Sequence, residues 1–223
     1  MKSSKIFAAD LDETLTHGGE SRLEEDVKKA LLKLRNNGWL LVLATGRDKP
    51  YLMKREDIEN IFDAWIMEGG LSIYIPSQNI YKVFVTSQWI SFIESLRKTG
   101  FVKPKENTVT LRRENIEEVK RIAEKFQIDV SFRDNKGTIM LLPKGVNKAY
   151  ALHKLMEILG VDGPIVVVGD SEIDLELFEE ADFSVAVANA EDQIKAKADY
   201  VTRGADGEGV VEAVELILEK FSG

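Results

Sequence analysis

The hydrophobic positions of the chain follow two different periods, and the change of period divides its 223 residues into three stretches. In the first and last stretches, short continuous apolar runs alternate with segments that carry apolar residues at helical spacing. Such runs are typical of parallel strands that are buried on both faces. The predicted strands are residues 5–11, 39–44, 63–67, 71–75, 164–168, 183–187 and 199–202. The predicted helices are residues 22–37, 50–61, 148–159, 172–181, 190–197 and 208–221.

The middle stretch, from about residue 77 to 146, has apolar residues in period two, as in a sheet with one exposed face. Strands are predicted there at residues 80–85, 108–113, 128–133 and 138–142, with helices at 88–99 and 116–126. We therefore predict an α/β fold with a Rossmann-like, mostly parallel sheet as its core and an inserted α+β cap domain. The core domain is expected to comprise residues 1–76 and 147–223, and the cap residues 77–146.

Charge differs between these two parts. Residues 77–146 hold 13 Lys and Arg against 8 Asp and Glu, a net charge of +5, whereas the rest holds 17 against 30, a net charge of −13. One interpretation is that each part simply has solvated helix faces. The other is that a basic lid faces an acidic, metal-loaded site and helps to attract an anionic substrate.

Composition narrows the class of protein. The net charge of −8 argues against a general nucleic-acid binder. The sequence has no apolar run of about 18 residues, the length that a membrane span needs. The absence of cysteine excludes disulfides and thiolate chemistry. No export signal is visible, so we expect a cytoplasmic monomer or homodimer whose partner is a small molecule, with no nucleic acid or membrane involved.

Acidic residues stand where two of the buried strands end. Asp10 and Asp12 follow the first apolar run, and Asp170 and Asp174 follow the run at 164–168. Because open α/β sheets build their sites at the carboxyl ends of parallel strands, we expect these carboxylates to meet. They would repel one another unless a cation lay between them, and a site with oxygen ligands alone favours Mg²⁺.

This arrangement suits phosphoryl transfer. Asp10 would attack phosphorus and form a mixed anhydride, and Asp12 would protonate the leaving oxygen and then activate water. The alternative is ordinary: an Asp-x-Asp sequence often marks a turn, and acidic residues at a helix start are favoured by the helix dipole.

Three further positions carry candidate phosphate ligands. Thr45, Gly46 and Arg47 follow the strand at 39–44, where a hydroxyl and backbone N–H groups would hold phosphoryl oxygens, although the same residues also suit a simple turn. Lys148 opens a predicted helix, where the dipole disfavours a cation. Its position suggests a compensating anion, such as a bound phosphate and Asp10.

The motifs together resemble a known family. Asp10-Leu-Asp-Glu-Thr-Leu, Ala44-Thr45-Gly46-Arg47, Lys148 and Gly169-Asp170-Ser-Glu-Ile-Asp174 match the four ordered motifs of the haloacid dehalogenase-like hydrolases. The insert between the second and third motifs resembles the α/β cap of the Cof-type subgroup. The chain length and the stretch from Lys144 to Ala149 are most similar to archaeal-type phosphoglycolate phosphatases.

The resemblance implies a role for each matching residue. Asp10 is then the nucleophile and Asp12 the acid and base, while Mg²⁺ is bound by Asp10, the backbone carbonyl of Asp12, Asp170 and Asp174. Thr45 and Lys148 would hold the phosphoryl group. Three residues depart from the family pattern, and they are Glu13 in place of glycine, Glu68 in place of asparagine and Ile173 in place of asparagine.

The substrate prediction rests on the cap. Alternation along residues 108–113 and 128–133 places Arg112 and Arg133 on the polar faces of their strands, and we expect those faces to look towards the core domain. Two arginines so placed would bind a second anionic group, such as a carboxylate, by bidentate hydrogen bonds. The alternative is that both belong to a solvated cap face.

The predicted function is therefore a Mg²⁺-dependent phosphatase for a small phosphorylated metabolite, with 2-phosphoglycolate as the first candidate. A sugar-phosphate phosphatase or a phosphomutase of the same fold is the nearest alternative. A phospho-receiver or binding module also uses strand-end aspartates and a lysine, but such modules need no cap. A nucleotide-binding dehydrogenase is disfavoured because no G-x-G-x-x-G follows the first strand.

Overall fold

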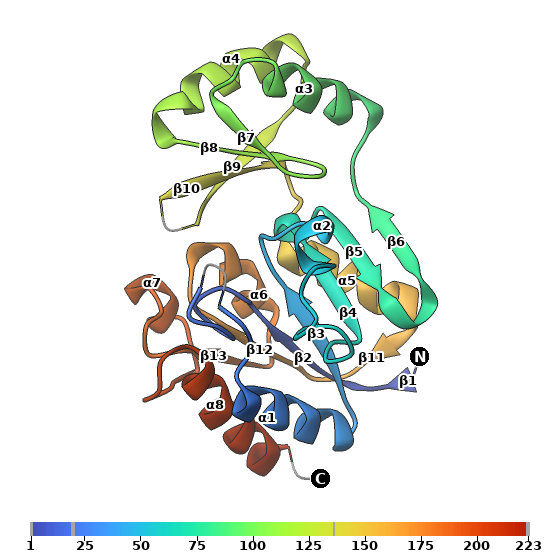
Figure 1. Ribbon diagram of the computed structural model, residues 1–223, viewed down its shortest axis with the longest axis vertical. Helices are drawn as coiled ribbons and strands as arrows, with labels where there is room; N and C mark the ends of the chain where they lie inside the picture. The colour runs from blue at the N-terminus through green and yellow to red at the C-terminus, as the bar shows by residue number, and fades with distance from the viewer. Residues whose placement is uncertain (1, 19–20, 136, 222–223) are drawn as a thin grey trace.

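The computed structural model describes residues 2–18, 21–135 and 137–221. Its described residues form one large sheet, one smaller sheet and a short two-stranded pair. The strands of the large sheet are β2 (Lys5–Ala9), β3 (Trp39–Ala44), β4 (Ala64–Met67), β5 (Ser72–Ile75), β6 (Ile80–Val83), β12 (Ile165–Gly169), β13 (Phe183–Ala186) and β14 (Tyr200–Val201). They lie in the order β14-β13-β12-β2-β3-β4-β5-β6 (Figure 1). All neighbours are parallel except β5, which runs antiparallel to both β4 and β6.

The register of the central strands brings their carboxyl ends to one level. Ala9 at the end of β2 pairs with Val168 of β12 on one side and with Leu43 of β3 on the other. The residues that follow these three positions therefore leave the sheet side by side. The mostly parallel α/β core predicted from the apolar runs is confirmed, because these strands are buried along almost their whole length.

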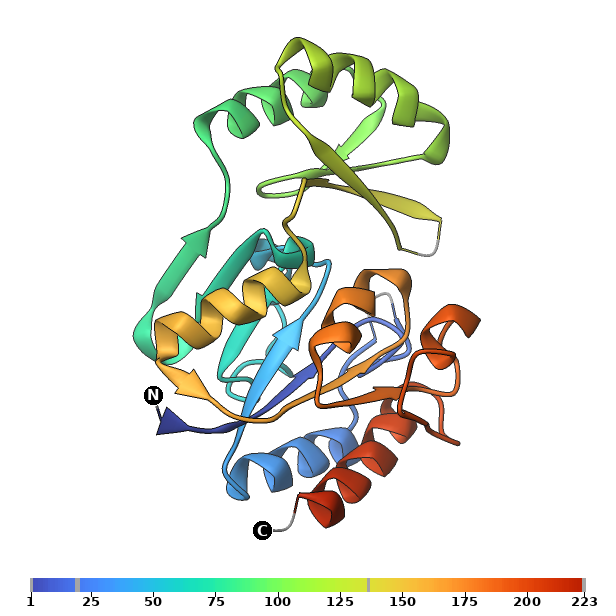
Figure 2. The same cartoon turned by 180° about the vertical axis from the view of Figure 1, so that it is seen from behind.

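Helices cover both faces of the large sheet. Helices α1 (Glu25–Asn36) and α8 (Asp206–Lys220) pack together on one face, and α5 (Lys148–Leu159) and α6 (Leu175–Glu180) pack together on the other (Figures 1 and 2). The short helix α7 (Asp192–Lys195) precedes β14. Strands β1 (Lys2–Ser3) and β11 (Val161–Asp162) form the separate parallel pair. No helix among the described residues has the length and apolar character to cross a bilayer.

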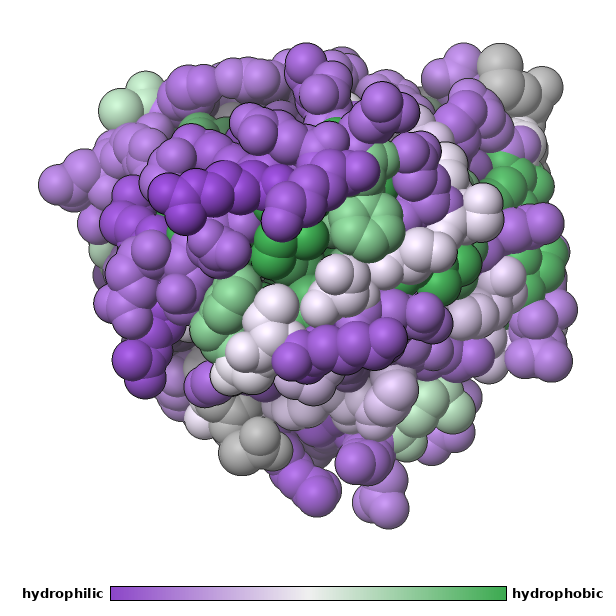
Figure 3. Space-filling model, turned by 90° about the horizontal axis from the view of Figure 1, so that it is seen from above, coloured by the Kyte–Doolittle hydropathy of each residue, from purple (hydrophilic) through white to green (hydrophobic). Residues whose placement is uncertain are grey.

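The cap stands over the carboxyl edge of the large sheet (Figure 1). Its strands are β7 (Val102–Pro104), β8 (Val109–Leu111), β9 (Val130–Asn135) and β10 (Thr138–Pro143), in the antiparallel order β7-β8-β10-β9. Helices α3 (Ser87–Arg97) and α4 (Ile116–Lys125) cover the outer face of this sheet and share a hydrophobic cluster with it. Seen from above, the cap surface is mainly hydrophilic, with a narrow apolar strip between polar side chains (Figure 3).

Three expectations need correction. The strand expected at residues 80–85 does not belong to the smaller sheet, because β6 pairs with β5 and extends the large sheet. We therefore propose that the cap begins near Phe84 rather than at residue 77. The other two corrections concern the helix at residues 50–61 and the exposed face of the cap sheet.

The helix expected at residues 50–61 is only one turn long, α2 (Lys49–Leu52). After it the backbone continues in tight turns, in which Arg55, Ile58 and Ile61 each donate to the carbonyl three residues before. Arg55 also binds Asp57 through two hydrogen bonds, and Asp57 in turn accepts a bond from the backbone N–H of Leu23. These tertiary contacts replace the helical hydrogen bonds that the apolar spacing alone predicts.

The cap sheet has no exposed face along β10. Ile139 and Leu141 point into the cap cluster, whereas Met140 and Leu142 pack against Leu71 and Ile173 of the core domain. All of these side chains are buried. The face that looks towards the core is therefore partly apolar, and it holds the cap against the large sheet.

Candidate active site

The structure brings the predicted acidic residues together at the carboxyl edge of the large sheet. Asp10 follows β2, Asp170 follows β12, and Asp174 lies in the short 3-10 helix Glu172–Asp174 after it. Carboxylate oxygens of these three residues lie within 4.8 Å of one another, and all three side chains are buried.

Lys148, the first residue of α5, lies between two of these carboxylates. Its ammonium donates to Asp10 Oδ1 and to Asp174 Oδ1, each at 2.6 Å, and the lysine is fully buried. The unfavourable place of a cation at a helix start is thus compensated by anions, as the sequence predicts for Asp10.

A close backbone contact fixes the position of the first residues of α5. Gly70 has φ +108°, and a Cβ on it would lie 2.0 Å from the carbonyl oxygen of Asn147 and 2.9 Å from the backbone nitrogen of Lys148. Only glycine permits this approach. Asn147 also caps the helix, because its side-chain oxygen accepts a hydrogen bond from the backbone N–H of Tyr150.

Asp174 and Asp170 are held by their own local contacts. Asp174 Oδ2 accepts bonds from the backbone N–H groups of Asp170 and Ser171. The bond from Ser171 is one half of a capping box, in which the Ser171 side chain accepts from the backbone N–H of Asp174. Gly169 leaves room for this carboxylate, since a Cβ there would lie 2.8 Å from Asp174 Cγ. Thr14 donates its hydroxyl to Asp170 Oδ1 at 2.5 Å.

The electrostatics of the cluster favour an additional cation. Three carboxylates and one ammonium carry a formal charge of −2 when all are ionised. Burial, together with the charges of Asp174 and Asp170, raises the pKa of Asp10 well above its usual value, and Lys148 offsets only part of this. Burial would lower the pKa of Lys148, but Asp10 and Asp174 outweigh it and raise that pKa. A buried set of hard oxygen donors with excess negative charge fits a divalent cation such as Mg²⁺.

Asp12 and Arg47 face each other at the edge of the cluster. Arg47 binds both carboxylate oxygens of Asp12, with Nε–Oδ2 at 2.8 Å and an Nη2–Oδ1 distance of 2.7 Å. Its guanidinium also lies 4.2 Å from the centre of the Tyr51 ring. Both side chains of the pair are about a quarter exposed, so a substrate could reach them.

Thr45 and Gly46 directly precede Arg47 in the chain. Thr45 is buried, and its hydroxyl accepts a hydrogen bond from the backbone N–H of Arg47. Its carbonyl accepts a bond from Gly69, and the Arg47 carbonyl accepts one from Glu68. The segment predicted to cradle phosphate is therefore tied to the turn that contains Glu68.

Glu68 connects this segment to the cap, which the sequence did not predict. It is fully buried, and its carboxylate accepts bonds from the backbone N–H and the side-chain Nδ2 of Asn107 at 2.8 and 2.7 Å. Asn107 belongs to the turn Lys105–Thr108 that joins β7 to β8. Burial raises the pKa of Glu68, and the two bonds from Asn107 oppose this rise.

The two arginines predicted for substrate recognition lie in different surroundings. Arg112 is not brought to the acidic cluster, since its side chain is 82% exposed and faces Glu114 at 3.7 Å. Arg133 reaches the core domain, where it binds Glu176 of α6, and its buried Nε has no acceptor among the described residues. A role for either arginine in substrate binding remains a prediction.

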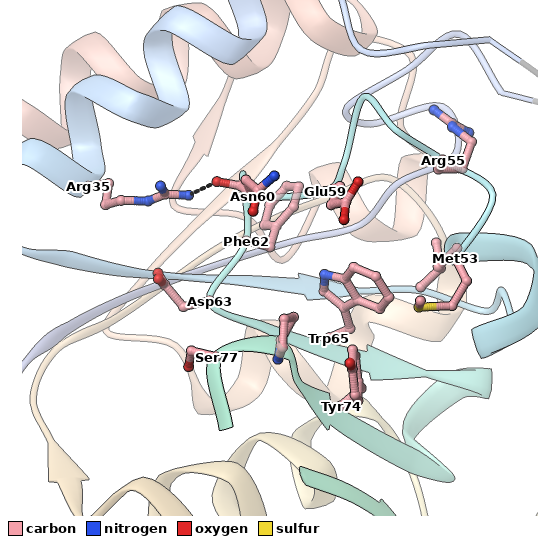
Figure 4. A pocket seen from close by; sticks show the side chains of 12 residues that line it. Arg35, Met53, Arg55, Glu59, Asn60, Phe62, Asp63, Trp65, Tyr74 and Ser77 are labelled. Carbon is pink, nitrogen blue, oxygen red and sulfur yellow. Dashed lines mark hydrogen bonds between the residues drawn. The ribbon is translucent and has the colours of Figure 1, made fainter. Parts of the chain in front are cut away.

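A separate cavity of about 470 Å³ lies beside β4 and β5, with the side chains of Trp65 and Tyr74 in its wall (Figure 4). Arg35 borders it and donates to the carbonyl of Asn60. No residue of the acidic cluster lines this cavity, so it is distinct from the candidate active site.

Comparison with known proteins agrees with this arrangement. Two overlapping segments, residues 7–82 and 58–214, match the family described as haloacid dehalogenase-like hydrolase. A phosphoglycolate phosphatase of Methanosarcina acetivorans is 32% identical over 223 residues, which covers 96% of each chain.

Two solved structures show the same fold. A protein of Thermoplasma acidophilum matches with a TM-score of 0.77 at 21% identity, covering 99% of both chains. The subclass IIB sugar phosphatase BT4131 matches with a TM-score of 0.73 at 19% identity, covering 98% of this chain and 99% of its own. Since the family match spans most of the sequence and the curated relative aligns over 96% of its length, this chain belongs to the haloacid dehalogenase-like hydrolases and is an enzyme, with a cap whose fold matches the Cof-type subgroup.

Proposed function

We propose that the protein is a Mg²⁺-dependent phosphatase that hydrolyses a small phosphorylated metabolite through an aspartyl-phosphate on Asp10. The observation that carries the proposal is the buried cluster of Asp10, Asp170 and Asp174 with Lys148 bonded between two of its carboxylates. A nucleophilic carboxylate that must approach a phosphate dianion needs such compensation of charge.

The cluster has the donors that a hard divalent cation requires. Asp10, Asp170 and Asp174, with the backbone carbonyl of Asp12, would hold Mg²⁺. When bound, the ion would neutralise negative charge on the phosphoryl group. Lys148 would supply a second positive charge, and Thr45 and the backbone of Gly46 would hold phosphoryl oxygens.

The reaction then proceeds in two steps. A carboxylate oxygen of Asp10 attacks phosphorus, the ester P–O bond breaks, and Asp12 donates a proton to the leaving oxygen. Water next attacks the phosphorus of the aspartyl-phosphate, Asp12 takes its proton, and Asp10 is regenerated as phosphate leaves. Because Arg47 holds both oxygens of Asp12 in the structure, we propose that a bound phosphoryl group draws this guanidinium away and frees Asp12 for proton exchange.

The proposed substrate is 2-phosphoglycolate. The support for it is the relative from Methanosarcina acetivorans, which is a phosphoglycolate phosphatase and aligns with 96% of this chain.

Phosphate release from 2-phosphoglycolate tests the proposal. We expect hydrolysis in the presence of Mg²⁺, none after verified removal of metal with EDTA, and a loss of more than about 10³-fold in Asp10→Asn. Asp129→Asn is the matched control, since Asp129 is an exposed cap residue whose one ion pair among the described residues, at 3.3 Å, is with Lys144. Full activity without metal, or more than a tenth of the wild-type rate in Asp10→Asn, would contradict the mechanism.

The same measurement separates a phosphatase from a phosphomutase. A phosphatase releases phosphate at its full turnover rate from the monoester alone. A mutase protects its phosphoenzyme from water and would release phosphate only slowly unless a sugar bisphosphate were added.

A further inference from the structure

We propose that Lys105, carried by the cap turn Lys105–Thr108, selects the substrate by binding a second anionic group beyond the phosphate. The proposal rests on the phosphatase function proposed above and deepens it, because it assigns the residue that distinguishes a carboxylated phosphate ester from a neutral one.

The turn that carries Lys105 is held in place from the cap side. Its first backbone N–H donates to the carbonyl of Thr108 at 3.0 Å. Arg97 of α3 donates to the carbonyls of Lys105 and Glu106, and Trp89 donates its indole N–H to the carbonyl of Asn107 at 2.9 Å. A turn with this many fixed carbonyls presents its side chains in a defined direction.

The core domain fixes the same turn from below. Glu68 accepts two hydrogen bonds from Asn107, and its own backbone N–H donates to the carbonyl of Arg47 at 2.9 Å. Glu68 therefore links the cap turn directly to the phosphate cradle, residues 45–47. Lys105 lies two positions before Asn107 in the same turn, and Arg47 and Asp12 are within its electrostatic reach.

Within the described part of the chain, the ammonium of Lys105 has no partner of its own. Lys105 is half-buried, and its ammonium makes no hydrogen bond or ion pair with any residue that the structure describes. The charges within its electrostatic reach are those of Asp48, Arg47, Glu68 and Asp12, which surround the cradle. Burial lowers the pKa of Lys105, and the nearby acids only partly oppose this, so an anionic ligand would stabilise the charged form.

The chemistry of the ligand follows from these neighbours. On the core side, Lys148, Thr45 and Arg47 would already bind the phosphoryl group. An additional cation on the cap side matches an anion at the other end of a short substrate, such as the carboxylate of 2-phosphoglycolate. Lys103, two residues earlier on β7, is exposed and provides a matched control.

The test compares two substrates of the same length. Ethyl phosphate has a methyl group where 2-phosphoglycolate has a carboxylate. In Lys105→Met we expect kcat/KM for 2-phosphoglycolate to fall about 10- to 100-fold, the range for a hydrogen bond between charged groups. The value for ethyl phosphate should stay within about threefold of wild type, and Lys103→Met should change neither.

The second part of the test reverses the charge at position 105. Lys105→Glu should lower the preference for 2-phosphoglycolate further and raise kcat/KM for 2-aminoethyl phosphate, which carries an ammonium in place of the carboxylate. Equal losses for all three substrates would show that Lys105 holds the phosphoryl group or merely supports the turn, and unchanged kinetics would show that it does neither. Each of these results would overturn the proposal.

Binding measurements keep this test independent of turnover. If the wild-type protein hydrolysed neither ester, the proposed function would fail, but calorimetric affinities for 2-phosphoglycolate and ethyl phosphate in wild type and Lys105→Met would still decide the role of Lys105. A selective loss of 2-phosphoglycolate affinity supports the proposal, and equal affinities in both proteins reject it.

Discussion

Replacing Lys148 by methionine should destabilise the metal-free protein strongly. The ammonium is fully buried and lies 2.6 Å from both Asp10 and Asp174. At an effective dielectric constant of 20, each contact corresponds to about 6 kcal/mol of attraction, most of which is offset by desolvation. Methionine has a similar length, so the cavity that it leaves is small, and the main effect is three buried carboxylates without a cation.

The free energy of unfolding should fall by about 3–5 kcal/mol, the cost of breaking a buried ion pair. For a chain of this length, 1 kcal/mol shifts the melting temperature by about 2–4 °C, so Lys148→Met should melt about 6–20 °C below wild type. Thermal unfolding followed by circular dichroism, in EDTA and in Mg²⁺, measures the effect. Mg²⁺ should stabilise the variant more than it stabilises wild type, because the ion replaces the missing positive charge.

The pH dependence of this effect has a defined sign. Burial and the neighbouring carboxylates raise the pKa of Asp10 in the folded state above the unfolded value of about 3.8. The folded protein therefore binds a proton at Asp10 more tightly than the unfolded chain does, and this contribution to stability is lost as the pH rises through the folded-state pKa. The difference in melting temperature between wild type and Lys148→Met should be largest at neutral pH and should shrink as the pH approaches 3.8.

Lys154→Met is the control on the same helix. Lys154 is partly exposed and pairs with Glu157 at the surface, so its replacement should shift the melting temperature by no more than about 2 °C. A metal-free Lys148→Met protein that melts within about 2 °C of wild type would refute the reasoning. So would a loss of stability that Mg²⁺ leaves unchanged.

Two further substitutions test how the site is assembled. Gly70→Ala should lower stability by about 1–3 kcal/mol and reduce turnover, because its Cβ would displace the start of α5, whereas Gly100→Ala, at φ +78° with open space around it, should keep full turnover. Unchanged turnover in Gly70→Ala would contradict the claim that this contact positions the start of α5. Glu68→Ala should abolish the hydrogen-exchange protection of the Asn107 amide, since that N–H loses its acceptor, and retained protection would show that the cap closes without this contact.

The central strands could be predicted because burial alone specifies them. The run at residues 39–44 reads Trp-Leu-Leu-Val-Leu-Ala and forms β3 with the same bounds, and the helix expected at 148–159 is α5 without change. Parallel strands covered on both faces have few alternatives, because almost all of their residues must be apolar. The acidic residues that follow such strands are then placed by topology, which is why the sequence predicts that Asp10, Asp170 and Asp174 lie together.

The expectations that were wrong depend on contacts between distant residues. Residues 50–61 have helical apolar spacing, but the pair Arg55 and Asp57 and the bond from Leu23 hold most of them in turns. Strand β6 alternates like a cap strand, yet it completes the large sheet next to β5. Neither outcome is encoded in the local pattern, since the partner that decides each one lies in another segment.

The structure shows the backbone conformations and contacts of the residues that depart from the family pattern. Glu13 and Glu68 both have positive φ, of 60° and 51°, in the conformation that glycine and asparagine adopt most easily. Glu68 binds the turn at Asn107, 39 residues away, and Ile173 packs against Met140 and Leu142 of β10.

Two of the three unusual residues therefore contact the cap rather than the reacting groups. In the proposed function the motif residues carry out the reaction, and most of them lie at strand ends that the sequence makes visible. We propose that substrate choice depends on a cap side chain, and the position of the cap turn is fixed by the pair Glu68 and Asn107, which no local pattern connects. For this reason the sequence pointed to arginines on the cap strands, whereas the structure places a lysine of the neighbouring turn, Lys105, within electrostatic reach of Asp12 and Arg47.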